Sequence, residues 1–355
     1  MKRILAGLAV VAALGSGNVL ARSEENRLTT DFQDWIVGCD NARACTAIGL
    51  AAGDEAGGVG PHLYITRGAG PNDAPRVEIG VGFSEEADSL KNGDIIDILV
   101  EGPRPLRFNA TLRQAGEYEI PQLALAATDT PRFMAALKDG TRVRLSHEAT
   151  DLHAVSLSGS SAALRWVDDR QKRAGTVTAL VARGPKPASA VPAAPPAPVV
   201  RLAPRLSQAN LPTTLPAALR NRDDVKLCSE EYAIDDIRGP NIERLSDKDY
   251  LWQIPCGAGA YNFTALFIIS HRDGSAARSP NFTPESPDQL VNGRYDPSTR
   301  LLKAFAKGRG VGDCGDEATW AWDGRAFRLI HHAVMETCMG VTSEHWVRLW
   351  RARTQ

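Results

Sequence analysis

The sequence predicts a mainly β protein of two domains: an amino-terminal β-sandwich-like domain with two short helices, and a carboxy-terminal antiparallel β-meander. Three observations support this prediction. Short runs of alternating apolar and polar residues recur between turn residues, which is typical of strands. A segment rich in proline and alanine divides the six cysteines into two and four. The length of 355 residues corresponds to about two domains.

Residues 1–21 have the three parts of a secretory signal peptide. Lys2-Arg3 is a basic start, Ile4–Leu14 is apolar, and a small-residue cleavage site ends at Ala21. The apolar part is shorter than the roughly 20 residues of a membrane-spanning helix, and no cysteine follows for lipid attachment. We therefore expect a periplasmic or secreted protein that is not a lipoprotein and has no membrane span.

The amino-terminal domain is predicted over residues 31–184. Trp35, Val37 and Cys39 share one face of its first strand because side chains alternate along a strand. The chain returns from a turn at Cys45. Further strands are predicted at His62–Arg67, Arg76–Phe83, Asp94–Val100, Thr141–His147 and Leu152–Leu157.

Two helices interrupt these strands. Thr130 is the expected cap of the first, which has a proline at its first position and a glycine beyond its end. Ser158 or Ser160 opens the second, which runs to about Gln171. The segment Val177–Ala182 fits either a helical turn or a strand.

A proline- and alanine-rich linker is predicted over residues 185–215, followed by the carboxy-terminal domain over residues 216–354. Such a composition cannot form a packed core, so we expect a semi-rigid, extended spacer and two domains that move relative to each other. After one short helix, turn residues separate strands predicted at Leu301–Lys307, Ala318–Trp322, Arg325–His331 and His345–Arg351.

An even number of cysteines behind an export signal predicts disulfides. The expected pairs each close a local loop: Cys39–Cys45, Cys228–Cys256 and Cys314–Cys338. No Cys-x-x-Cys pair is present and no histidine stands at ligand spacing from a cysteine, so we expect no metal site.

Several separated segments resemble a known family. They are Phe32-x-Asp-Trp-x-Val-x-Cys39, Ser158-Gly-x-Ser-Ala-Ala-Leu-Arg-Trp166-x-Asp-Asp-x-Gln171, Gly175-Thr-Val-Thr-Ala-Leu-Val-Ala-Arg-Gly184, Lys307-Gly-Arg-Gly-x-Gly-Asp-Cys-Gly315 and Trp320-x-Trp-Asp-Gly-x-x-Phe327. Together they look like the DUF1176 family over nearly the whole mature chain. The first half also resembles the invasion-associated locus B family. Both resemblances imply a bacterial envelope protein, and neither supplies catalytic residues.

The first candidate binding element is the glycine loop, residues 307–315. Its four glycines can turn backbone N–H groups inward, and Lys307 and Arg309 add positive charge beside Asp313, a combination that can hold a phosphate or carboxylate. The alternative, which we favour, is a tight turn whose glycines supply positive φ next to a disulfide. The spacing fits neither a P-loop nor a dinucleotide fingerprint, so we expect no cofactor.

The second candidate is the alternating set Trp346, Arg348 and Trp350. If Val347 and Leu349 point to the core, these three side chains face outward as a strip suited to a sugar ring or a protein partner. The alternative, which we favour, is that the tryptophans belong to the core, where large aromatic side chains are usually buried.

No hydrolase motif is present: Gly-x-Ser-x-Gly, Ser-x-x-Lys and His-Glu-x-x-His are all absent. Adjacent carboxylates such as Asp168-Asp169 are expected to be solvated. We therefore expect a non-enzymatic binding or envelope-maintenance protein, with inhibition of a cell-wall hydrolase as a special case. The alternative is a hydrolase of envelope glycans or peptides. Expected partners are an anionic envelope component, a glycan or a periplasmic protein; a formal net charge of −1 argues against nucleic acid.

Overall fold

The computed structural model describes residues 28–51, 60–82, 85–113, 120–231, 240–283 and 286–355. The predicted signal peptide, residues 1–21, lies outside these ranges. Among the described helices, none has the length and apolar character needed to cross a membrane.

The amino-terminal domain is built on one ten-stranded sheet in which all neighbouring strands are antiparallel, in the order β1-β2-β3-β4-β5-β8-β7-β6-β9-β10. The sheet curls around its own core, because Ala51, just after β3, bridges to Val155 in the last strand. Its strands are β1 (Thr30–Phe32), β2 (Trp35–Cys39), β3 (Cys45–Gly49), β4 (His62–Arg67), β5 (Arg76–Gly80), β6 (Ile95–Glu101), β7 (Leu106–Arg113), β8 (Gln122–Ala124), β9 (Arg142–His147) and β10 (Thr150–Ser156).

Three helices accompany this sheet: α1 (Glu85–Asp88), α2 (Thr130–Leu137) and α3 (Ser160–Arg170). Both predicted helices are present, and α3 begins at Ser160, one of the two residues expected to open it, but the expected cap of α2 is wrong. Asp129, not Thr130, precedes α2. Gly159 precedes α3 with φ of 93°, and a Cβ there would meet the carbonyl oxygen of Phe32 at 1.8 Å, so only glycine fits. The buried hydroxyl of Ser160 instead donates to the carbonyl of Leu137.

The carboxy-terminal domain has two antiparallel sheets around a shared core. The four-stranded sheet contains β12 (Asn241–Arg244), β13 (Asp249–Ala258), β14 (Phe263–His271) and β15 (Gln289–Val291). The five-stranded meander contains β16 (Arg294–Asp296), β17 (Leu301–Lys307), β18 (Gly315–Trp322), β19 (Phe327–Met335) and β20 (Val347–Arg351). Trp320 and Trp322 are buried between the sheets and belong to their shared core.

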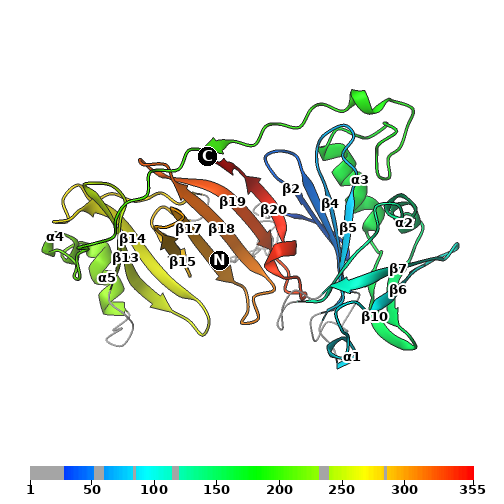
Figure 1. The fold of residues 1–355 in the computed structure, drawn as a ribbon, viewed down its shortest axis with the longest axis horizontal. Helices are drawn as coiled ribbons and strands as arrows, with labels where there is room; N and C mark the ends of the chain where they lie inside the picture. Colours follow the sequence, from blue (N-terminus) through cyan, green and yellow to red (C-terminus); the bar gives the residue numbers. More distant parts are fainter. Residues whose placement is uncertain (1–27, 52–59, 83–84, 114–119, 232–239, 284–285) are drawn as a thin grey trace, which may run out of the picture.

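Layers of secondary structure follow one another along the molecule (Figure 1). The helices α4 (Ala217–Arg220) and α5 (Asp223–Glu231) cover the outer side of the four-stranded sheet, and the meander and the ten-stranded sheet follow. Three disulfides join the cysteine pairs expected from the sequence: Cys39–Cys45, Cys228–Cys256 and Cys314–Cys338. They indicate an oxidising, extracytoplasmic compartment.

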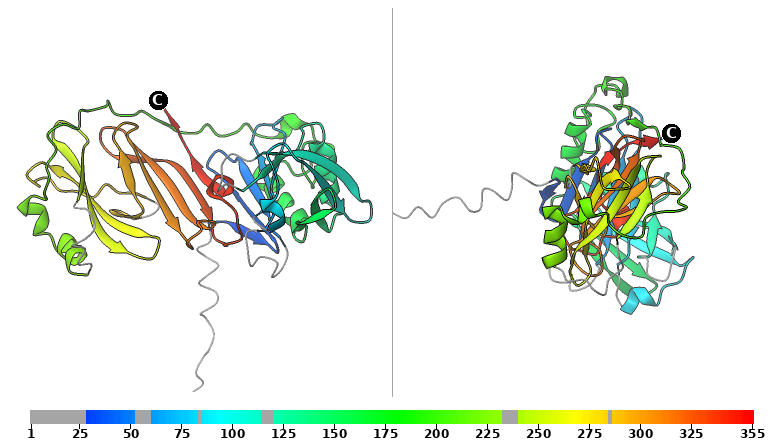
Figure 2. Two further views of the ribbon diagram at one scale, coloured as in Figure 1. Left: turned by 60° about the horizontal axis from the view of Figure 1, so that its bottom comes forward. Right: turned by 90° about the vertical axis from the view of Figure 1, so that its left-hand side faces the viewer.

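The proline- and alanine-rich segment is an extended chain that is fixed to the domains along its length. It runs along one side of the molecule between the two domains (Figures 1 and 2) and is fixed at several points. Val191 is buried, Val200 in β11 (Val199–Val200) pairs with Thr354 in β21 (Arg353–Thr354), and the amide of Ala203 donates to the carbonyl of Trp322. The segment Val177–Ala182 is neither helix nor strand but a series of turns and bends.

The expectation of two domains that move relative to each other is wrong, because the domains share a hydrophobic core. Ile36 and Ile48 of the amino-terminal sheet belong to one buried cluster with Met335, Trp346 and Val347 of the meander. Sequence composition describes the connecting segment but carries no information about contacts between residues such as Ile48 and Met335, which are more than 280 positions apart in the chain.

Candidate functional site

The junction between the domains results from alternation along β2 and β3. Trp35 and Val37 point into the core of the amino-terminal domain. Ile36 lies on the opposite face, where it is also buried. Strand β20 packs against this second face, and Gly38 leaves the space for Val347: a Cβ at that glycine would lie 2.4 Å from the Val347 side chain.

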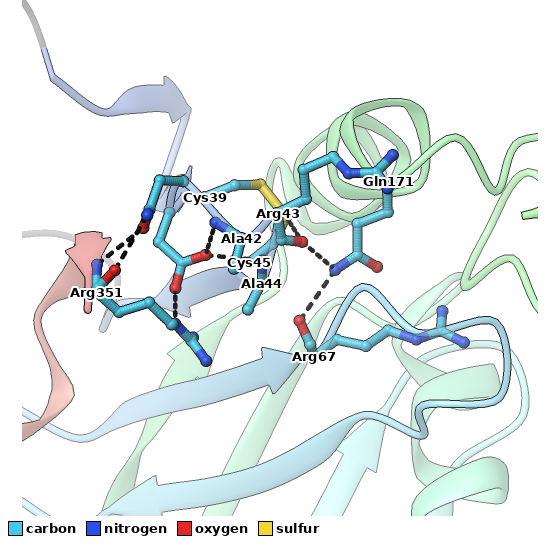
Figure 3. Close-up of polar contacts among 10 residues, drawn as sticks. Cys39, Ala42, Arg43, Ala44, Cys45, Arg67, Gln171 and Arg351 are labelled. Carbon is cyan, nitrogen blue, oxygen red and sulfur yellow. Dashed lines mark hydrogen bonds and ion pairs between the residues drawn. A yellow bond between two sulfur atoms is a disulfide. The ribbon is translucent and has the colours of Figure 1, made fainter. Parts of the chain in front are cut away.

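An ion pair between Asp40 and Arg351 anchors one end of the junction, where Figure 3 labels Arg351. The fully buried carboxylate of Asp40 accepts the backbone N–H groups of Ala42 and Ala44 at 2.9 and 3.0 Å, and it forms an ion pair with Arg351. Asn41 adds two bonds to the backbone of Arg351, at 3.0 and 2.8 Å. The Cys39–Cys45 disulfide closes the same turn, so this bond holds the surface that receives β20.

Two histidines and a glutamate link the domains farther along. His62 Nε2 lies 3.1 Å from His345 Nδ1, and His345 Nε2 lies 3.2 Å from a carboxylate oxygen of Glu78. Burial, with the nearby His345, lowers the pKa of His62 to about 3, so this ring is neutral at physiological pH. The hydrogen bond from His345 lowers the pKa of Glu78. Since both nitrogens of His345 are engaged, its ring positions the domains.

A groove of about 710 Å³ opens beside this junction. We call it the interdomain groove. Its volume is within the usual range for small-molecule sites. Side chains from β3, β4 and β5 form one wall and β20 contributes the other. Its polar and charged lining residues are Thr46, Tyr64, Thr66, Arg67, Asp73, Arg76, Glu78, Arg348 and Arg351.

The groove has hydroxyl groups along one wall. Thr46 pairs with Thr66 across β3 and β4, and Tyr64 lies on the same face, two residues from Thr66. Burial raises the pKa of the Tyr64 phenol, while Arg348, a hydrogen bond with Thr46, and Arg351 act in the opposite direction. The phenol therefore remains a neutral donor close to cationic side chains.

Positive charge exceeds negative charge among the groove residues. Arg351 is paired with Asp40, and Glu78 with His345. Arg76 and Arg348 are exposed, and neither has an ion pair with any residue that the structure describes. Two guanidinium groups without a carboxylate partner can each bind a phosphate or carboxylate through two parallel hydrogen bonds.

Buried polar residues after α3 hold the other end of the groove. Gln171 Nε2 lies within 3.1 Å of the carbonyls of Arg43, Arg67 and Gly68, and thereby joins three loops (Figure 3). Burial, with the like charge of Arg173, lowers the pKa of Arg67 to about 10, a value at which it stays charged.

The expectation that Asp168 is solvated is wrong. Its carboxylate is fully buried and accepts the backbone N–H groups of Leu180, Val181 and Ala182 at 2.7–3.0 Å. Two of the segments that resemble the DUF1176 family, residues 158–171 and 175–184, therefore contact each other through Asp168. Their residues stabilise the fold.

The glycine loop lies outside the interdomain groove. Arg309 forms a bidentate ion pair with Asp313, at 2.7 and 2.5 Å, and Asp313 also accepts the amide of Gly340 at 2.6 Å. The backbone of Lys307 is bonded to the side chain of Asn262. The charged groups of this loop are thus largely used within it, an arrangement that favours the structural alternative.

The outward-facing strip of Trp346, Arg348 and Trp350 does not form. Trp346 is 1% exposed, precedes β20, and donates its indole N–H to the carbonyl of Val341. Trp350 is half-buried and donates to Leu329. The β20 register shifts between Arg348 and Trp350, which breaks the alternation that the strip required, and the burial of Trp346 agrees with the favoured core alternative. Arg348 is the predicted site residue that lines the groove.

Sequence reasoning missed the wall of the groove on β4 and β5, although a signal was present. Both strands were predicted, and their polar positions alternate with Leu63, Ile65, Val77 and Ile79, all of which are buried. The polar face of these two strands could therefore be predicted from the sequence. The opposite wall of the groove could not, because Arg348 is more than 280 residues from Tyr64 in the chain.

Comparison with known proteins identifies the family of this chain. A family model described as "Protein of unknown function (DUF1176)" matches residues 29–353. The chain is 32% identical over 343 residues to "Uncharacterized protein YpfG" of Escherichia coli (strain K12), covering 91% of this chain and 92% of that protein. Among solved structures, invasion associated protein b from Bartonella henselae aligns with 15% identity and a TM-score of 0.31, over 41% of this chain and 99% of its own.

Proposed function

Because the chain belongs to the DUF1176 family, whose members are described as proteins of unknown function, we propose its role from the geometry of its own site. The protein is a non-enzymatic binding protein of the bacterial envelope, exported to the periplasm by a cleaved signal peptide over residues 1–21. It holds an anionic envelope component in the interdomain groove.

The observation that carries this proposal is the pair Arg76 and Arg348. They line one groove from different domains, and neither is paired with a carboxylate among the described residues. Hydroxyl groups of Thr46, Thr66 and Tyr64 stand on the same wall as Arg76 and supply neutral donors. An anion bearing phosphate or carboxylate groups would use both kinds of donor.

A hydrolase is less well supported at this groove. A general base needs a nitrogen or oxygen directed at the substrate. His345 has both ring nitrogens engaged, with His62 and Glu78. The pKa of Glu78 is lowered, which weakens it as a base. Neither Lys307 nor Arg309 lines this groove.

Retention of the mature chain on envelope polymers tests the proposal. Lipopolysaccharide presents phosphates, peptidoglycan presents carboxylates, and cross-linked polyvinylpyrrolidone serves as an uncharged polymer without sugar units. We expect retention on one of the two anionic polymers, weakened by 0.5 M salt because exposed charges are screened, and none on polyvinylpyrrolidone. Lack of retention on both anionic polymers would overturn the proposal.

Charge reversal identifies the site. Arg76→Glu and Arg348→Glu should each weaken binding about tenfold, since a charge-assisted hydrogen bond contributes about 1.5 kcal/mol or more. Arg107→Glu is the matched control: Arg107 is an exposed arginine of the same sheet outside the groove. If all three variants lose affinity equally, binding depends on overall charge and the groove is not the site.

A further inference from the structure

A second cleft lies on the carboxy-terminal domain. It has a volume of about 490 Å³ and is lined by residues of β12, β13 and β14 and by the connection between β15 and β16. A smaller hollow adjoins it and shares Asn241, Gln253 and Arg294 with it. The two together form a trough that extends inward to Glu243 and Tyr295.

The trough combines an apolar lining with polar side chains that have no partner among the described residues. Pro255, Ala265 and Phe263 contribute apolar surface. Asn241, Glu243 and Arg294 have no ion pair or side-chain hydrogen bond with any of the described residues, in contrast to the neighbouring Asn292, which bonds to the amide of Phe263 and to the carbonyl of Phe305. A largely apolar pocket with a few convergent polar groups is the usual form of a small-molecule site.

Charge distinguishes this trough from the interdomain groove. Its charged residues are one arginine, Arg294, and one glutamate, Glu243, so it has no excess of either sign. Burial raises the pKa of Glu243 against the nearby positive charge of Arg294. Such a site disfavours a strongly anionic ligand and suits one rich in hydroxyl groups, because amide, guanidinium and carboxyl groups together offer both donors and acceptors.

Phe263 supplies an aromatic surface at the edge of the trough. Its side chain is 51% exposed, an unusual state for a large apolar residue, and its backbone amide is held by Asn292 at 2.9 Å. A pyranose ring has an apolar C–H face and a hydroxylated edge. An exposed aromatic ring beside planar polar side chains is complementary to both.

We propose that this trough binds a neutral oligosaccharide, with a sugar ring stacked on Phe263 and its hydroxyl groups bonded to Asn241, Arg294 and Glu243. The site is separate from the interdomain groove and does not depend on the proposed anion binding. In a binding protein of the envelope, it would add recognition of an uncharged glycan segment to recognition of a charged group.

Titration calorimetry of the mature chain with chitotriose and with maltotriose tests this proposal. We expect one of the two trisaccharides to bind with a dissociation constant in the millimolar range or tighter. Phe263→Ala should weaken it at least tenfold, and Arg294→Ala to a smaller extent. Tyr261→Ala is the matched control, since Tyr261 is an exposed aromatic residue of the same hairpin that does not line the trough.

Three outcomes overturn the proposal. Neither sugar binds at 20 mM, or Phe263→Ala and Tyr261→Ala lose the same amount of sugar affinity. In the third outcome, a dodecyl detergent binds the trough more tightly than the sugar and displaces it. Because Phe263 is exposed, its substitution should leave the melting temperature unchanged, and that measurement separates lost binding from lost folding. Arg76→Glu and Arg348→Glu should leave sugar binding intact, so failure of the anion proposal and failure of this one are distinguishable.

Discussion

The glycine loop and the interdomain groove each present an arginine of the carboxy-terminal domain, and the two arginines are in opposite situations. Arg309 is engaged in two hydrogen bonds with the buried Asp313 four residues later. Arg348 has no carboxylate partner among the described residues and lines a cavity made with the other domain. The comparison teaches that an arginine in a glycine-rich segment indicates a binding site only where the folded chain leaves its charge without an ion-pair partner.

The largest expected effect tests whether the groove is a fixed feature of the molecule. Trp346→Ala removes a fully buried indole from the core shared by the domains and should lower the free energy of unfolding by about 3–5 kcal/mol. Trp350→Ala should cost about 1–2 kcal/mol, because that side chain is half-buried. Urea unfolding measures both. Equal costs would mean that the two domains do not rely on this contact.

Much of the fold, and less of the site, could be predicted from the sequence. Strand β4 begins and ends at the residues predicted, His62 and Arg67, because apolar and polar side chains alternate there. The disulfides follow from chain proximity. The groove could not be predicted, because its second wall comes from Arg348, and pairing of distant surfaces depends on shape that no local pattern encodes. Ile36 and Ile48 were a local signal for the contact between the domains, because they are apolar residues on the face of their strands opposite to Val37 and Ala47.

The second prediction concerns the glycine loop as a structural turn. Gly315 has φ of 137°, and a Cβ there would lie 1.9 Å from the carbonyl oxygen of Ala306. Gly315→Ala should therefore destabilise the protein by about 2–4 kcal/mol. Gly310→Ala is the matched control, since its nearest contact would be Tyr261 at 3.6 Å, and it should change stability by less than about 0.5 kcal/mol. A tolerated alanine at position 315 would contradict the structural role of the loop.

The smallest expected effect compares the two arginines directly. At pH 7, Arg309→Ala leaves the buried Asp313 carboxylate without its main partner and should cost about 1–2 kcal/mol, a range that allows for the partial exposure of Arg309. Arg348→Ala should cost less than about 0.5 kcal/mol, because no paired group is left behind. Urea titrations at one salt concentration measure the difference. If Arg348→Ala destabilises the protein more than Arg309→Ala does, the contrast between an ion-paired and an unpaired arginine is wrong.

The pH profile of Arg309→Ala separates the ion pair from simple packing. Burial alone would raise the pKa of Asp313, but the hydrogen bonds from Arg309 and the amide of Gly340 hold it below its ordinary value. A lowered pKa in the folded state contributes stability above the unfolded value of about 3.9, and this contribution is lost as pH falls through the folded value. The cost of Arg309→Ala should therefore shrink between pH 7 and pH 3.5, by less than about 1.4 kcal/mol, the worth of one pKa unit. Arg107→Ala, at an exposed position without an ion pair among the described residues, should show no such change. A cost that stays constant on acidification would assign the role of Arg309 to packing of its aliphatic stem, because only the charged carboxylate distinguishes the two explanations.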